Sequence, residues 1–100
     1  MKAEVTLLPS DQGGRKGPTP YECWRVIVRV GNSSRDVRFY FRVGQRAEPG
    51  GPSRLVHMVM LTPESAALFP VGMDFEIWEG RVVGRGVVTS MDPSTAHESP

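Results

Sequence analysis

The alternation of apolar and polar residues along the chain predicts six short β-strands. The segment 22–30, ECWRVIVRV, shows it most clearly, because every second residue from Trp24 to Val30 is apolar. A period of two residues is typical of a strand with one buried face. The expected strands cover residues 3–8, 22–30, 37–43, 54–61, 73–79 and 82–91. In the third strand, the residues expected to point inward are Val37, Phe39, Phe41 and Val43.

Glycine and proline separate these segments and mark turns between them. The chain contains 11 Gly and 9 Pro, which are spread over the intervals 9–20, 31–36 and 44–53 and shorter breaks. The pattern contains no long amphipathic helix, internal repeat or domain boundary. Short strands at regular spacing favour an all-β fold, a closed antiparallel barrel or a small sandwich. We expect one domain over residues 1–91 and a polar, disordered tail over residues 92–100.

Charge is distributed unevenly, although the net charge is only +1. Residues 25–54 contain seven arginines and two acids, whereas residues 55–100 contain two arginines and six acids. A basic middle suits an anionic partner. The single cysteine, Cys23, excludes an intrachain disulfide and fits a reducing compartment. The chain shows no signal peptide and no apolar run long enough for a membrane span, so we expect a soluble, cytoplasmic protein.

Two separated motifs resemble the last β-barrel domain of translation elongation factor Tu. The segment 75–88, FEIWEGRVVGRGVV, is similar to the closing hairpin of that domain, with one glycine fewer and Trp78 in place of an arginine. The segment 3–18, AEVTLLPSDQGGRKGP, is similar to its opening strand and following loop, and EPGG at 48–51 stands near the family's Pro-Gly. The resemblance spans roughly residues 3–91 and implies a six-stranded antiparallel closed β-barrel that stands alone. In the family this barrel packs against a GTP-binding domain, contacts the T-stem of aminoacyl-tRNA and takes part in binding the exchange factor.

The glycine-rich basic loop DQGGRKGPTP, residues 11–20, is a candidate phosphate site. It lacks the G-x-x-x-x-G-K-[ST] spacing of a P-loop, and no helix follows it, so we do not expect it to bind a nucleotide. One interpretation is a flexible connection across one end of the barrel. The other follows from the resemblance, which implies contact with an RNA backbone. The RNA-binding candidates it gives are Gly14, Arg15 and Lys16 of the loop with Glu79, Gly80 and Arg81 of the closing hairpin.

Four arginines are expected on one outward face of the second and third strands: Arg25, Arg29, Arg38 and Arg42. The register that pairs Val30 with Val37 places Arg29 opposite Arg38 and Arg25 opposite Arg42. Like charges directly across a ladder are destabilising. Such a face therefore needs either acidic neighbours or an anionic partner, such as tRNA, another structured RNA or an acidic protein surface. The alternative is an arginine face neutralised by water and counterions. Candidate screening acids are Asp74, Glu76 and Glu79.

The fourth strand, RLVHMVML at 54–61, is apolar on both faces apart from His57. One face fills the barrel, and the other needs a cover. The apolar stretch SAALF at 65–69, within the segment 62–72, is the expected cover. The alternatives are a weak homodimer and a protein partner, such as a GTPase domain or another translation factor. The candidate contact residues are Leu55, His57, Met58, Val59 and Met60.

The titratable residues do not form a recognisable catalytic set. His57 lies in mid-strand and His97 in the tail, and Glu76 and Glu79 are three apart in a strand, so their side chains point to opposite faces. No spacing suggests a metal or cofactor site. We therefore expect a binding module rather than an enzyme, which binds RNA through its basic face or, alternatively, a protein through its fourth strand.

Overall fold

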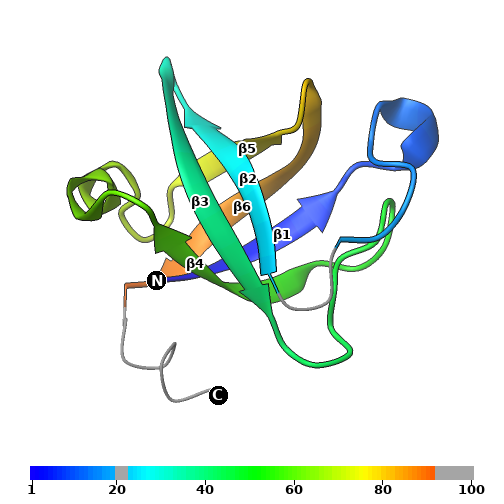
Figure 1. Cartoon of the computed structure of the whole chain (residues 1–100), viewed down its shortest axis with the longest axis horizontal. Helices are drawn as coiled ribbons and strands as arrows, with labels where there is room; N and C mark the ends of the chain where they lie inside the picture. The colour runs from blue at the N-terminus through cyan, green and yellow to red at the C-terminus, as the bar shows by residue number, and fades with distance from the viewer. Residues whose placement is uncertain (20–22, 92–100) are drawn as a thin grey trace.

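Six antiparallel strands close into a β-barrel in the computed structural model, which describes residues 1–19 and 23–91 (Figure 1). The order around the barrel is β1-β4-β3-β2-β5-β6, with β6 bonded to β1. This confirms the predicted all-β barrel. The strands are β1 Lys2–Leu7, β2 Cys23–Val30, β3 Ser33–Phe41, β4 Arg54–Met60, β5 Asp74–Trp78 and β6 Val82–Ser90, and two short 3₁₀ turns are η1 Ser10–Gln12 and η2 Pro63–Leu68. The expected tail at 92–100 and the expected strand start at Glu22 lie outside the described residues.

Alternation along the strands builds the core, as predicted. On β2, Trp24, Val26 and Val28 are buried, and on β3 Val37 and Phe39 are buried with them. Three buried aromatic rings lie in sequence in the core: Trp24 is tilted by 53° against Phe39 at a centroid distance of 5.9 Å, and Phe39 stacks on Phe75 at 6.1 Å. The prediction for Val43 was wrong. This residue is fully exposed, because β3 ends at Phe41 and the chain turns at Gly44, whose φ is 72°.

The hairpin between β2 and β3 is tighter than the predicted loop 31–36. The turn consists of Gly31 and Asn32 alone, since Val30 already pairs with Ser33. Gly31 has a φ of 58°, whereas Asn32 does not have a positive φ, which fits a type II′ turn with glycine at its first central position. The polar residues after the turn belong to β3. The register is therefore four residues away from the predicted one, with Val37 opposite Val26.

One end of the barrel is closed by η2 and the residue that follows it, Phe69. Phe69 is buried and packs edge-on against Phe75, with ring centroids 6.1 Å apart, and Leu68 packs against the same core. The apolar residues of this segment, Leu68 and Phe69, thus pack into the barrel end and do not cover the outer face of β4. That prediction was wrong: Leu55, Val59 and Leu61 remain 40%, 37% and 42% exposed.

The other end carries the two long loops, residues 8–19 and 42–53, which lie side by side (Figure 1). The buried Thr19 connects them: its backbone N–H donates to the carbonyl oxygen of Ala47, and its hydroxyl accepts the Ala47 N–H at 3.1 Å. Gly50 donates to the carbonyl oxygen of Leu7 at 3.2 Å. These bonds join the end of the opening loop to the loop 42–53, and that loop to the end of β1.

Candidate binding surfaces

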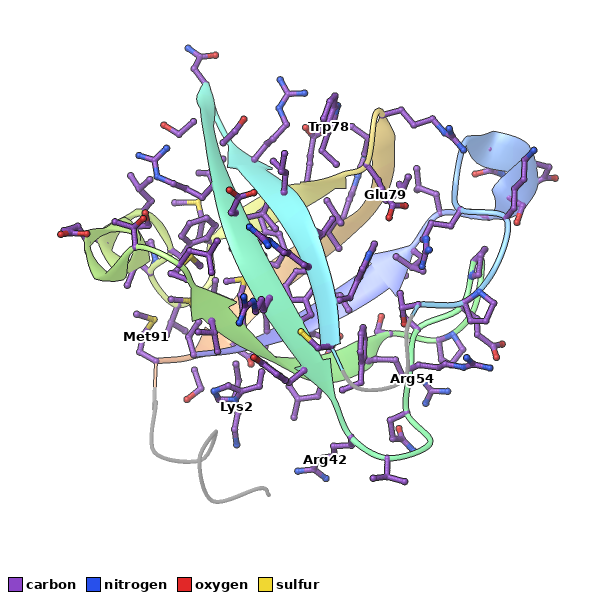
Figure 2. All side chains as sticks on the ribbon, viewed as in Figure 1. Lys2, Arg42, Arg54, Trp78, Glu79 and Met91 are labelled. Carbon is purple, nitrogen blue, oxygen red and sulfur yellow. The ribbon has the colours of Figure 1, made fainter. Side chains whose placement is uncertain are left out.

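The opening loop packs on the β5–β6 hairpin through an interaction of Arg15, Trp24 and Glu79. The guanidinium of Arg15 pairs with Glu79 at 3.1 Å and lies 5.2 Å from the ring centroid of Trp24. The indole N–H of Trp24 donates to the other carboxylate oxygen of Glu79 at 3.3 Å. In Figure 2 the labelled Glu79 lies at this hairpin, on the same side of the barrel as the opening loop. Both carboxylate oxygens of Glu79 are therefore bonded within the molecule.

Arg81, on the same hairpin, fixes the loop backbone. Its Nε donates to the carbonyl oxygen of Gly13 at 2.6 Å, and its Nη2 donates to that of Gly14 at 3.0 Å. Gly14 cannot be replaced easily, because a Cβ there would lie 2.0 Å from the carbonyl oxygen of Leu8. We name this set, Arg15, Trp24, Glu79 and Arg81 with the two loop carbonyls, the loop clasp. Lys16 and Gly80 are exposed and make no contact within it.

The loop clasp lies beside the strand pair with the shortest ladder in the barrel, β2 with β5. β2 pairs with β5 over only three residues, from Ile27 to Arg29, because β5 ends at Trp78. The first half of β2 therefore extends past the end of β5, and the clasp joins the loop, β2 and the hairpin at that place. Three of the candidate RNA-binding residues, Arg15, Glu79 and Arg81, thus have a structural role at this join.

The arginine face exists, but the predicted pairs were wrong. Arg25 lies directly opposite Arg38, whereas Arg29 lies opposite Ser34 on one side and Glu76 on the other. Arg42 lies beyond the end of β3 and points into solvent at the lower edge of the molecule (Figure 2). One of the proposed screening acids, Glu76, is thus correctly placed beside an arginine. Arg25 and Arg38 lie directly opposite each other as like charges, and the exposed Asp36 lies one outward position along β3, opposite Ile27.

The outward side chains of β4 and the residue after it form one row, which we call the β4 row: Leu55, His57, Val59 and Leu61. His57 is partly buried, and the three aliphatic side chains are exposed. Met58 is 1% exposed and lies in the core, and Met60 is partly buried and packs against it. Their assignment as contact residues was therefore wrong for the closed barrel. Met58 and Met60 alternate with the residues of the β4 row along the strand, so their side chains point inward.

Both neighbours of the β4 row are strands with polar outward residues. On the β3 side, Tyr40 lies opposite His57 and Arg38 opposite Val59. On the β1 side, Lys2 lies opposite His57 and Glu4 opposite Leu55. Tyr40 is 40% exposed and was missing from the sequence-based candidates. Tyr40 lies two residues from both Arg38 and Arg42, so the period of two in the sequence already indicated that its side chain points outward.

Two further observations limit the chemistry of the described residues. In residues 1–19 and 23–91, no three His, Cys, Asp or Glu side chains come together in a way that could hold a metal ion. None of the helical segments in the same ranges has the length and apolar character needed to cross a membrane.

Comparison with known proteins gives no assignment. No protein-family model matches the sequence, and no curated protein matches it significantly. What the molecule does is therefore inferred from its surfaces.

Proposed function

We propose that the protein is a non-catalytic binding module that docks on a partner protein through the outer face of β3 and β4. The β4 row carries this proposal, because its three aliphatic side chains stay exposed while the nearest apolar segment closes the barrel end. The outward row of β2 differs, since it includes Arg25 and Arg29. A row of exposed aliphatic side chains, here interrupted only by His57, is typical of an interaction surface.

The composition of the face also favours a protein partner. Tyrosine and arginine beside aliphatic residues are enriched at protein interfaces, where lysine and glutamate are depleted. Full burial of a Leu or Val side chain contributes about 1.5–3 kcal/mol. Leu55, Val59 and Leu61 are about two-fifths exposed, so covering the rest is worth about 1 kcal/mol each. Together they supply about 3 kcal/mol, or roughly a hundredfold in affinity.

The resemblance to the last barrel of elongation factor Tu suggests the class of partner. That barrel packs against a GTP-binding domain, so the partner we propose is a GTPase domain or another translation factor of the cytoplasm. The two motifs that carry the resemblance, residues 3–18 and 75–88, include the two sides of the loop clasp. The clasp therefore gives a physical reason for both motifs to occur in one chain.

A capture experiment from extracts of the source cells tests the proposal. Wild-type protein is compared with the variants Val59→Glu and Leu61→Glu and with the control Thr89→Glu, which places a charge at an exposed position on β6. Bound proteins and RNA are both identified. We expect a protein that is retained by the wild type and by Thr89→Glu and lost with both β4-row variants. Retention of the same proteins by all four would contradict the proposal.

RNA binding through Arg25, Arg38 and Arg42 is the second candidate function. The pairing of Arg25 with Arg38 across the ladder favours it, because a phosphate between the two guanidiniums would relieve their repulsion. Tyr40, on the same face, is placed to stack on an unpaired base. Binding that weakens steeply with salt and is lost in the double variant Arg25→Gln/Arg38→Gln, but not in Val59→Glu, would support RNA over protein.

A homodimer is the alternative occupant of the β4 row. Light scattering over a range of concentrations decides it, since a self-contact through this row would raise the mass of the wild type and not that of Leu61→Glu. A mass equal to one chain at every concentration removes this alternative.

A further inference from the structure

The closed barrel restricts how any partner can reach the β4 row. β4 is hydrogen-bonded to β1 on one side and to β3 on the other, so it has no free edge. An extended segment therefore cannot add to it as another strand, which is the usual way for a peptide to bind a sheet edge. The occupant must lie on the face of the sheet instead.

The width of the row favours a single helix over a second sheet. Adjacent strands are about 4.8 Å apart, so an apolar row one strand wide offers a strip about 10 Å across. An α-helix with its side chains has a diameter of about 10–12 Å. A packed second sheet would cover several strands at once. Here it would also cover the charged neighbours Arg38, Lys2 and Glu4 and remove them from water.

The length of the row fits a short helix. Outward residues on one strand are about 7 Å apart, so the row from Leu55 to Leu61 is about 20 Å long. At 1.5 Å per residue, a helix of about 13 residues covers that length. Its contacts would recur once per turn, at the i, i+3, i+4 and i+7 positions of an amphipathic helix.

The charges beside the row differ between its two sides. The β3 side carries Arg38 opposite Val59, with Arg25 directly behind it, and Arg42 follows at the strand end. Asp36 lies at the other end of this flank, where its carbonyl oxygen accepts the N–H of Leu61. The β1 side carries one charge of each sign, Lys2 and Glu4. A helix on the row therefore meets a flank with a net positive charge, concentrated at Arg38 and Arg42, on one side and a balanced flank on the other.

We propose that the occupant of the β4 row is an amphipathic α-helix of the partner protein, aligned with β4, whose Asp or Glu side chains lie along the flank that faces Arg38 and Arg42. This inference rests on the proposed function and specifies the partner element. It predicts both the period of the partner's apolar residues and the sign and side of its charges.

Selection from a displayed library of random peptides of about 16 residues tests this without knowledge of the partner. The library is selected on the wild type and counter-selected on Leu61→Glu, which lies after the end of β4 and so disturbs the ladder little. Enriched peptides are then titrated against wild type, Val59→Thr, Arg38→Glu and the control Thr89→Glu, with circular dichroism of each variant as a folding check. Val59→Thr keeps the β-branched shape in case Val59→Glu fails to fold.

We expect enriched peptides with apolar residues at helical spacing and acids on one flank, which become helical on binding. Val59→Thr and Arg38→Glu should each weaken them, the latter by about fivefold, and a peptide with Lys in place of its acids should prefer Arg38→Glu. Peptides that bind the row but alternate with a period of two, or carry basic flanks, would overturn the helix inference and leave the proposed function standing. A selection with no peptide dependent on the row also overturns the inference. The proposed function itself fails if capture from extracts is unaffected by Val59→Glu and Leu61→Glu.

Discussion

Replacing Glu79 with alanine should destabilise the barrel by about 2 kcal/mol. The ion pair with Arg15 has side chains 23% and 40% exposed, so solvent screening limits its contribution to about 0.5 kcal/mol. The larger effect comes from Trp24, which is 3% exposed and donates its indole N–H to Glu79. A buried donor left without an acceptor costs about 1–2 kcal/mol. For a domain of this size, that predicts a fall in Tm of roughly 8–16 °C.

Urea unfolding and thermal melting, followed by circular dichroism, measure this difference. Glu79→Gln retains an acceptor for Trp24 and loses only the charge, so it should cost about 0.5 kcal/mol, an amount that high salt abolishes. Glu4→Ala is the matched control, because Glu4 is an exposed acid on the barrel wall, and it should change stability by less than about 0.5 kcal/mol. If Glu79→Ala matches this control, the contacts of Glu79 with Arg15 and Trp24 do not stabilise the fold, and Arg15 is again available for RNA.

Three further substitutions test the packing, the loop contact and the register. Gly86→Ala places a Cβ 2.3 Å from the ring of Phe75, and should cost about 2 kcal/mol in urea unfolding, with part regained in the double variant with Phe75→Leu. Thr19→Val leaves a buried backbone N–H of the neighbouring loop without its hydroxyl acceptor, and should cost about 1–3 kcal/mol in the same assay. Arg38→Gln should raise the free energy of unfolding by about 0.2–1 kcal/mol at low salt, and should gain nothing when Arg25 is already Gln. A loss of stability in Arg38→Gln would contradict the observed register.

The barrel could be predicted because its signals are local. Alternation identified the buried residues of β2, and the glycines and prolines separated the strands. The register of the β2–β3 hairpin could not be predicted from the parity rule alone, which allows every odd sum of residue numbers. The run of polar residues at 31–36 predicts a long turn, although residues 33–36 belong to β3. The actual turn has two residues, of which only Gly31 has a positive φ.

The candidate surfaces were harder to predict, because they depend on which segments meet. The sequence singled out Arg15 and Arg81 as basic residues, but nothing local indicates that their partners are Glu79 and the loop carbonyls nearly 70 residues away. The exposure of the β4 row depended in the same way on where Phe69 packs, in the barrel end rather than over the sheet. Long-range contacts decided both outcomes.

The most direct test of the proposed function is the affinity of the purified partner for the β4-row variants. The partner captured by the wild type is titrated, after nuclease treatment, against wild type, Leu61→Glu, Thr89→Glu and Arg25→Gln/Arg38→Gln. We predict that Leu61→Glu weakens binding by about tenfold or more, beyond the roughly fivefold expected from uncovered aliphatic surface alone, because it also buries a charge. Thr89→Glu should leave the Kd unchanged. A Kd that is unaltered by Leu61→Glu and lost with the arginine variant would contradict docking through the β4 row.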